Sequence, residues 1–225
     1  MAPAWLTQCS ADVPAGDGWL GPGERAALAG LHVEKRREDW RLGRWTAKAA
    51  VARHLGVTAA RVEILAAADG APEAWLDGTA APVSVSLSHR AGRAVAAVDA
   101  APAVVGCDLE LVEPRSPAFV REWLTPREQA LIAQQEGHER DRLANLFWSA
   151  REAAAKVRRQ GLRLDVRRAE VALGAAGDGE WRPFSVRWGD DAPATAGWVR
   201  ADSGWVLTIA GEPGPGRPRR LSASP

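Results

Sequence analysis

The sequence predicts an α+β protein made of two units of similar size, each with a helical part followed by a β part. Apolar residues recur at helical spacing over 23–56 and again over 139–159, whereas the strict alternation over 83–88 is typical of a strand with one buried face. A length of 225 residues and a hydrophobic fraction of 46% allow one large domain or two small halves with packed cores. No repeat of individual residues is evident between the two units.

The first unit, residues 1–101, is predicted to begin with two helices within 23–56, the second of which stops at Gly56. A strand over 62–65 and a turn at 69–72 follow. The alternating segment 83–88 then turns into the apolar segment 94–98, which predicts a β-hairpin.

The second unit, residues 102–210, begins with an apolar segment that predicts a buried strand. Residues 211–225 are rich in Pro, Gly and Arg and have too little apolar content to pack, so we expect a disordered tail. The elements expected in the second unit are a strand over 104–109, helices near 116–123, 126–135 and 139–159, and strands near 170–173, 184–188, 197–200 and 205–210.

Charge and cysteine content exclude several classes of protein. The net charge is +1, from 29 basic and 28 acidic residues, so no overall field favours nucleic acid or a membrane, and any anion site must be local. Cys107 lies within a buried strand pattern and Cys9 is the only other cysteine, so we expect no disulfide and a reducing, cytoplasmic setting. The N-terminus lacks the pattern of a signal peptide, and no apolar run is long enough to span a bilayer, so neither export nor membrane insertion is expected.

Two short acidic motifs carry the chemistry that the sequence predicts. In Gly-Cys-Asp-Leu-Glu, residues 106–110, Asp108 and Glu110 are two positions apart on a strand and point the same way. The ordinary interpretation is a strand end that reaches solvent. However, two carboxylates on one side repel each other, and a magnesium ion would relieve that repulsion.

The second motif, Trp-Ser-Ala-Arg-Glu-Ala-Ala-Ala-Lys over 148–156, is predicted to be helical, with Glu152 and Lys156 one turn apart. A surface ion pair of little energetic value is the competing interpretation. Trp148 on the same face favours a cleft, because a large aromatic ring gains little by facing water. Three carboxylates and a lysine that converge are suited to magnesium-dependent transfer of a phosphate-linked group.

Together the motifs resemble the signature of the 4'-phosphopantetheinyl transferases, Gly-x-Asp-x-Glu followed by Trp-Ser-x-x-Glu-x-x-x-Lys, over roughly 36–173. The likeness is to the larger, surfactin-synthetase-activating type, with two similar halves related by a pseudo-twofold axis and a ligand cleft between them. The resemblance implies a holo-[acyl-carrier-protein] synthase that moves the 4'-phosphopantetheine arm of coenzyme A to a serine of an acyl or peptidyl carrier protein. Such enzymes serve fatty acid, polyketide or nonribosomal peptide assembly. We expect a monomer with no nucleic-acid or membrane partner.

The resemblance also implies roles for individual residues. Asp108, Glu110 and Glu152 would lie around a magnesium ion that holds the coenzyme A pyrophosphate. Glu152 would also help to deprotonate the attacking serine, and Lys156 would steady phosphate charge.

On the nucleotide side, the resemblance places His89 of the pair Ser88-His89 against the 3'-phosphate of coenzyme A; a lone histidine at a strand end is otherwise more often structural. Lys48, at the last basic position of a motif over 43–48, is expected to contact phosphate, in preference to Arg36 and Arg37.

Two positions depart from the family pattern. Ala71 stands where many relatives have a lysine, so one basic contact to the nucleotide is missing. Arg151 replaces the more common lysine before the glutamate, which keeps the charge but changes its geometry.

The carrier is expected to dock on the segment between the two motifs. The residues expected to contact it are apolar Phe119, Trp123, Leu124 and Leu131 and basic Arg121, Arg127, Arg140 and Arg142.

Two rival functions are considered. One is a non-catalytic homologue that binds a carrier or nucleotide, and the other is a magnesium-dependent phosphohydrolase.

Overall fold

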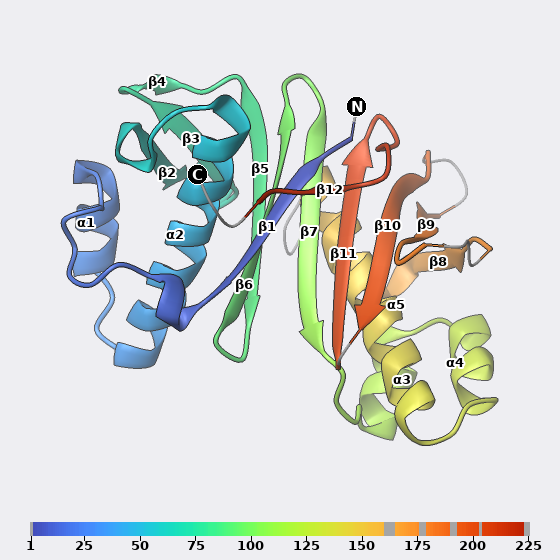
Figure 1. Cartoon of the computed structure of the whole chain (residues 1–225). Coiled ribbons are helices and arrows are strands. Elements are labelled where there is room, and N and C mark those ends of the chain that lie inside the picture. The colour runs from blue at the N-terminus through green and yellow to red at the C-terminus, as the bar shows by residue number, and fades with distance from the viewer. Residues whose placement is uncertain (1, 160–164, 176–178, 190–192, 203, 223–225) are drawn as a thin grey trace. The chain divides into compact units, whose positions relative to one another are not determined.

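The structure is a computed structural model that describes residues 2–159, 165–175, 179–189, 193–202 and 204–222. The chain divides into two compact units, Met1–Val105 with Pro218–Pro225, and Gly106–Arg217. Figure 1 labels the helices and strands of both units. Each unit combines helices with a sheet whose strands pair mainly antiparallel, which confirms the predicted α+β class.

The first unit has a four-stranded sheet in the order β12-β1-β6-β5. Strand β1 pairs antiparallel with β6, and β6 pairs antiparallel with β5 to form the predicted hairpin. Ala91 and Gly92 at the hairpin turn have φ angles of 46° and 72°, the positive values that a tight turn of this hand requires. The strands are β1 (Ala4–Cys9), β5 (Val83–Arg90), β6 (Arg93–Ala100) and β12 (Arg219–Arg220).

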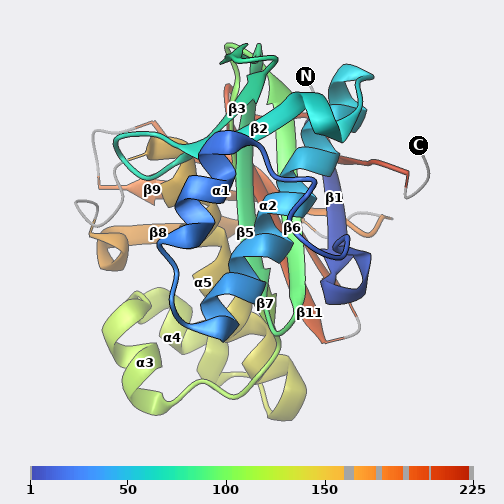
Figure 2. The same ribbon diagram turned by 90° about the vertical axis from the view of Figure 1, so that its left-hand side faces the viewer.

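Helix α2 (Glu34–Leu55) packs on one face of this sheet, and Figure 2 shows it in front of the strands together with α1 (Pro22–Ala29). Its inner face is made of small side chains such as Ala47 and Val51, both fully buried. The helix ends where Gly56 adopts a left-handed conformation, with φ of 69°, as the sequence predicted. A small sheet completes the unit: β2 (Val62–Ala66), β3 (Pro72–Leu76) and β4 (Thr79–Ala80).

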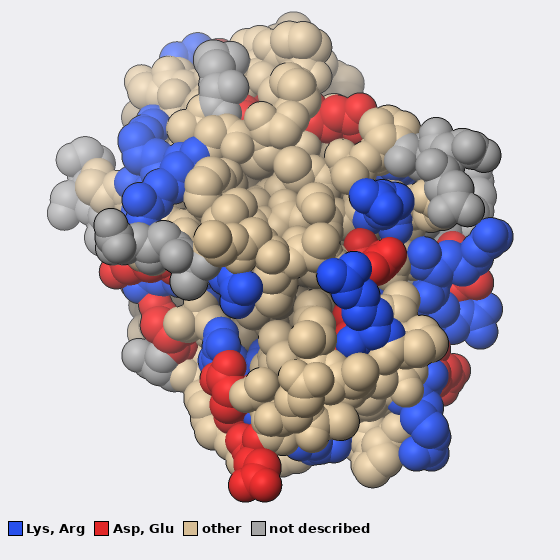
Figure 3. All heavy atoms as spheres, turned by 90° about the vertical axis from the view of Figure 1, so that its right-hand side faces the viewer, with Lys and Arg blue, Asp and Glu red and all other residues tan. Residues whose placement is uncertain are grey.

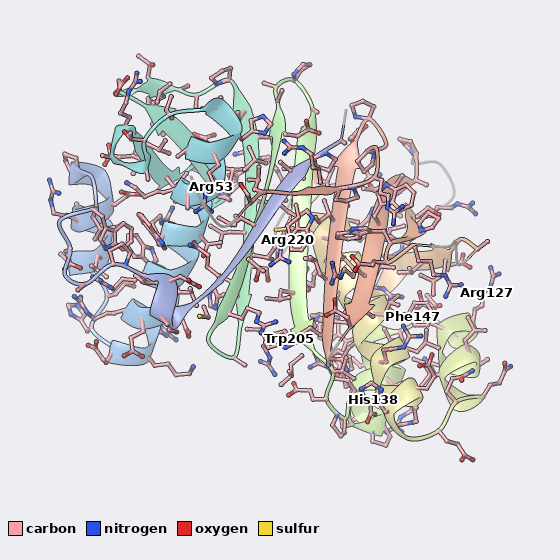
Figure 4. All side chains as sticks on the ribbon, in the orientation of Figure 1. Arg53, Arg127, His138, Phe147, Trp205 and Arg220 are labelled. Carbon is pink, nitrogen blue, oxygen red and sulfur yellow. The ribbon has the colours of Figure 1, made fainter. Side chains whose placement is uncertain are left out.

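The second unit has a five-stranded sheet in the order β7-β11-β10-β9-β8, and α5 (Gly137–Arg158) packs against it. Phe147, labelled in Figure 4, belongs to the buried side of α5 and has no exposed surface. Helices α3 (Pro117–Trp123) and α4 (Pro126–Ala133) precede α5, and the side chains of Ser116 and Thr125 cap their first turns. The strands are β7 (Val104–Leu111), β8 (Ala169–Leu173), β9 (Arg182–Trp188), β10 (Thr195–Asp202) and β11 (Trp205–Glu212).

The two units repeat one order of elements. A first strand (β1 or β7) is followed by a short helix (α1 or α4), a helix of 22 residues (α2 or α5) and then strands. The first strand pairs in each unit with the last long strand (β6 or β11), which pairs in turn with the strand before it (β5 or β10). The structure therefore contains the repeat of elements that two similar halves require.

The C-terminal segment differs from the expected disordered tail. Arg219 and Leu221 donate backbone hydrogen bonds to Pro3 and Trp5, at 2.9 and 2.8 Å, so β12 extends the first sheet. Leu221 is only 6% exposed and belongs to the core of the first unit, while Arg220, labelled in Figure 4, lies 5.3 Å from the ring of Trp5. An open sheet edge and one apolar side chain are enough to order this segment, although 223–225 lie outside the described residues.

Surface charge agrees with the balanced composition. On the face shown in Figure 3, basic and acidic side chains are interspersed among neutral ones. Within the described residues, none of the helices has the length and apolar character needed to cross a membrane.

Candidate active site

The candidate site is built where β7 crosses α5, and Gly106 makes that crossing close. A Cβ atom at Gly106 would lie 2.1 Å from the carbonyl oxygen of Ala153 and 3.0 Å from the backbone nitrogen of Val157. Only glycine fits there, because any side chain would meet helix backbone that cannot rotate away. The glycine of the first motif thus brings the strand within reach of the helix that carries the second motif.

Lys156 joins the two motifs. Its ammonium donates hydrogen bonds to the carbonyl oxygen of Cys107, at 2.8 Å, and to Oδ1 of Asp108, at 3.0 Å. Asp108 is 5% exposed. Burial alone would lower the pKa of Lys156, but the negative charges of Asp108 and Glu152 outweigh it and raise the pKa. Lys156 is therefore a fixed positive charge at this point of the site.

Glu152 lies on α5 one turn before Lys156 and is partly buried. Burial raises the pKa of its carboxyl group, the charge of Asp108 raises it further, and Lys156 partly offsets both effects. A carboxylate with a raised pKa is a stronger base than an ordinary surface carboxylate, which suits it to accept a proton near neutral pH.

Glu110 makes a different contact from the one expected of a metal ligand. Arg115 donates to its Oε2 at 3.0 Å and to Oδ1 of Asn145 at 2.7 Å, so the guanidinium neutralises this carboxylate. Within the part of the chain that the structure describes, no three His, Cys, Asp or Glu side chains gather as a metal site. Arg115 could not be predicted as a partner of Glu110, because it lies outside both motifs.

A magnesium ion nevertheless fits the carboxylates that the structure brings together. Burial raises the pKa of Glu152, and the negative charge of the neighbouring Asp108 raises it further, so the two carboxylates repel each other when both are charged. Magnesium is commonly held by one or two carboxylates, with water and substrate phosphate oxygens as its other ligands. Two neighbouring carboxylates are therefore a suitable donor set.

Ser88 and His89 lie at the end of β5 in the first unit, opposite Val95 and Ala94 of β6. His89 is exposed, and its ring lies against α2 at Gly43, where an added Cβ would be 3.8 Å from His89 Cδ2. The imidazole thus lies beside the helix and remains exposed.

Lys48 does not fit the predicted contact with phosphate. Its side chain is 1% exposed, and its ammonium lies 2.6 Å from Oε2 of Glu24, a carboxylate that is also fully buried. An enclosed and neutralised ammonium cannot reach a phosphate in solvent. The sequence placed Lys48 on the correct helix but on the wrong face, because nothing in the motif itself indicates the partner on α1.

Other basic residues of α2 remain candidates for that contact. The guanidinium of Arg37 donates hydrogen bonds to the backbone carbonyl oxygens of Leu28 and Leu31. Arg36 is exposed and lies about two helical turns before Gly43 on the same face. The structure therefore favours Arg36 over Lys48 as a cation of α2 that a phosphate could reach.

Trp148 packs against aromatic rings of α3. Its ring centre lies 5.2 Å from that of Phe119 and 5.6 Å from that of Trp123, both in edge-to-face geometry. All three residues are partly exposed, and Leu131 on α4 is 40% exposed. The face of α5 with Trp148 is thus an aromatic surface, whereas Ser149 is buried against Thr208 of β11 at 2.9 Å.

Comparison with protein families agrees with this architecture. Residues 104–210 match the model of the 4'-phosphopantetheinyl transferase superfamily, and residues 24–99 match that of the 4'-phosphopantetheinyl transferase N-terminal domain. No significant match was found among curated proteins. The protein belongs to the 4'-phosphopantetheinyl transferase superfamily, in the larger type with two domains, and it is a transferase of phosphopantetheine to carrier proteins.

Proposed function

We propose that this protein transfers the 4'-phosphopantetheine arm of coenzyme A to a serine hydroxyl of an acyl or peptidyl carrier protein. The serine oxygen forms a bond to the phosphorus that carries the pantetheine arm, and the phosphoanhydride bond breaks to release adenosine 3',5'-bisphosphate. The observation that carries the proposal is the cluster of Glu152, Asp108 and Lys156 at the crossing of α5 and β7.

Glu152 accepts the proton of the serine hydroxyl, directly or through a water molecule. The raised pKa of its carboxyl group supports this role, because a base works best when its pKa approaches the working pH. Lys156, held by Asp108 and the Cys107 carbonyl, stabilises negative charge as the phosphoanhydride breaks.

Asp108 and Glu152 would hold a magnesium ion, and Glu110 would join them if Arg115 released it. The ion, when bound, would supply positive charge beside the pyrophosphate oxygens. In the absence of the ion, the same two carboxylates would repel a pyrophosphate, because like charges repel.

Ser88 and His89 contact the 3'-phosphate of coenzyme A, and Arg36 supplies a further positive charge in place of the enclosed Lys48. Ala71 offers no charge at the turn after β2, so nucleotide affinity depends more on these residues.

The carrier protein docks on the aromatic surface of Phe119, Trp123 and Trp148, and the exposed Leu131 of α4 adds an apolar contact. Exposed Arg121 and Arg127 attract an acidic carrier. The proposal includes a monomer, and a cytoplasmic setting, which suits a chain with only two cysteines, Cys9 and Cys107.

Intact-mass spectrometry of apo carrier incubated with coenzyme A and magnesium tests the proposal. A mass gain of one phosphopantetheine group, absent with Glu152→Gln, supports transfer. Binding of coenzyme A without a mass gain supports a non-catalytic homologue instead. Cleavage of coenzyme A without carrier modification supports a phosphohydrolase. A panel of fatty acid, polyketide and nonribosomal peptide carriers then identifies the substrate.

A further inference from the structure

The two units share a buried carboxylate clamp that the sequence did not reveal. In the first unit, Glu24 accepts from Lys48 at 2.6 Å, from the backbone nitrogen of Gly21 at 2.8 Å and from that of Ile64 at 3.0 Å. The clamp joins the start of α1, the middle of α2 and the strand β2.

The second unit repeats this arrangement with different residues. Glu128 accepts from Arg151, from the backbone nitrogen of Thr125 at 2.8 Å and from that of Val171 at 2.9 Å. The clamp joins the equivalent elements α4, α5 and β8. Both carboxylates are fully buried, and each is the third residue of a short helix that begins with proline.

Arg151 adds contacts that the lysine of the first unit lacks. Its Nη2 also donates to the carbonyl oxygen of Ala169 at 2.8 Å, and its Nη1 donates to that of Phe147 at 3.3 Å. A guanidinium fixes direction as well as distance, because its donors lie in one plane. The side chain therefore restricts rotation and sliding of α5.

The position of this clamp matters because Arg151 directly precedes Glu152. Successive residues of a helix point about 100° apart, so fixing the direction of Arg151 fixes that of Glu152. On the other side, β7 lies against the carbonyl of Ala153 through Gly106. Helix α5 is thus held at the residues immediately before and after Glu152.

The first unit has the clamp but no carboxylate in the position of Glu152. Ala49, which is 5% exposed, follows Lys48 where Glu152 follows Arg151. The repeated contacts are therefore a structural feature of both units, and the second unit has a candidate catalytic group beside them.

We propose that Glu128 and Arg151 are positioning residues, which set the place of Glu152 and Lys156 for the transfer reaction. This inference rests on the proposed function. It goes beyond stability, because a misplacement of about 1 Å at a reacting group can lower a rate by about 10²-fold.

Glu24→Gln and Glu128→Gln form a matched pair for the test. Each removes one charge from a buried ion pair with the same three contacts, so both variants should melt at lower temperature. Holo-carrier formation is measured at a temperature where both remain folded. We expect Glu128→Gln to lower kcat by about 10- to 100-fold, with the KM for coenzyme A within about threefold, and Glu24→Gln to leave kcat within about twofold. Equal kcat values for the two variants would overturn the proposal.

A conservative change separates position from charge. Arg151→Lys keeps the ion pair that Lys48 makes in the first unit, so kcat should remain within about threefold of wild type, whereas Arg151→Gln should resemble Glu128→Gln. Loss of kcat to the same degree in Arg151→Lys and Arg151→Gln would contradict a positioning role for the ion pair.

The double variant Glu128→Gln, Arg151→Met covers the case in which Glu128→Gln does not fold. It leaves no unpaired buried charge, so its stability should recover. Its kcat should nevertheless stay about tenfold or more below wild type, because the ion pair that holds α5 is gone. Wild-type kcat in this variant would overturn the inference alone. Failure of the wild-type protein to modify any carrier would overturn the proposed function and this inference with it.

Discussion

Replacement of Gly106 by alanine should damage both stability and transfer. The added Cβ would lie 2.1 Å from the Ala153 carbonyl oxygen, whereas ordinary contacts begin near 3.4 Å. The nearest of the neighbouring atoms, the Ala153 carbonyl oxygen, belongs to the backbone of the long helix α5, so it cannot move aside as a flexible side chain would. Strand β7 must therefore retreat from α5 by more than about 1 Å at this point.

The expected magnitudes follow from that displacement. Overpacking of this kind typically lowers the free energy of unfolding by about 1–3 kcal/mol. Retreat of β7 also lengthens the bonds from Lys156 to Cys107 and Asp108, now 2.8 and 3.0 Å, so the rate of transfer should fall by about 10- to 100-fold.

Urea denaturation gives the free energy of unfolding, and intact-mass assay of carrier modification gives the rate. Gly214→Ala is a control in the same unit, because its Cβ would only touch that of Ala196 at 3.4 Å. The control should change the free energy of unfolding by less than about 0.5 kcal/mol. If Gly106→Ala behaves like Gly214→Ala in both measurements, the close crossing of β7 and α5 is not what holds the site together.

Four further substitutions test single residues. Glu152→Gln should lower kcat by about 10²- to 10⁴-fold, and kcat should stay low in excess magnesium. The kcat of Asp108→Asn should recover in part under the same conditions. Full recovery of kcat in Glu152→Gln would show that Glu152 is a metal ligand and not the base. His89→Ala should weaken binding of coenzyme A, measured by calorimetry, and affect 3'-dephospho-coenzyme A much less; equal weakening would make His89 structural. Burial lowers the pKa of His54, an effect that Asp99 partly opposes, so the unfolded chain takes up a proton first as the pH falls below about 6.5. When the pH is lowered from about 7.5 to about 5.5, the free energy of unfolding, measured by urea denaturation, should therefore fall more in wild type than in His54→Gln. Equal decreases would refute a lowered pKa of His54.

The long elements were predictable because their sequences repeat a simple pattern. The apolar spacing of α2 and α5 and the stop at Gly56 predicted both helices, and the alternation of 83–88 predicted β5. Strand β12 was missed, because two residues carry no periodicity. This strand is held by backbone hydrogen bonds to the N-terminal segment around β1 and by burial of Leu221, and both exist only once the sheet has folded.

Part of the candidate active site was predictable, because the two motifs carry residues that must lie close together to act on one ligand. Spacing within each motif placed Asp108 on a strand and both Glu152 and Lys156 on a helix, and the structure joins Lys156 to Asp108 at 3.0 Å. Lys48 was misplaced because a basic residue on a helix does not reveal which neighbour it faces. Its partner Glu24 lies on another helix, and the contact exists only after α1 and α2 have packed.

The clamp explains why the repeat between the units was invisible in the sequence. What is repeated is a set of contacts: a buried glutamate, a cation on the long helix and a backbone N–H of the next strand. Lysine in one unit and arginine in the other satisfy the same carboxylate, so residue identity is lost while geometry is kept. Breaking such a buried pair costs more than replacing both partners, since one charge is left enclosed. The carboxylate must therefore keep a cation as its partner, either lysine or arginine, and two units of different sequence can in this way still hold their long helices by the same contacts.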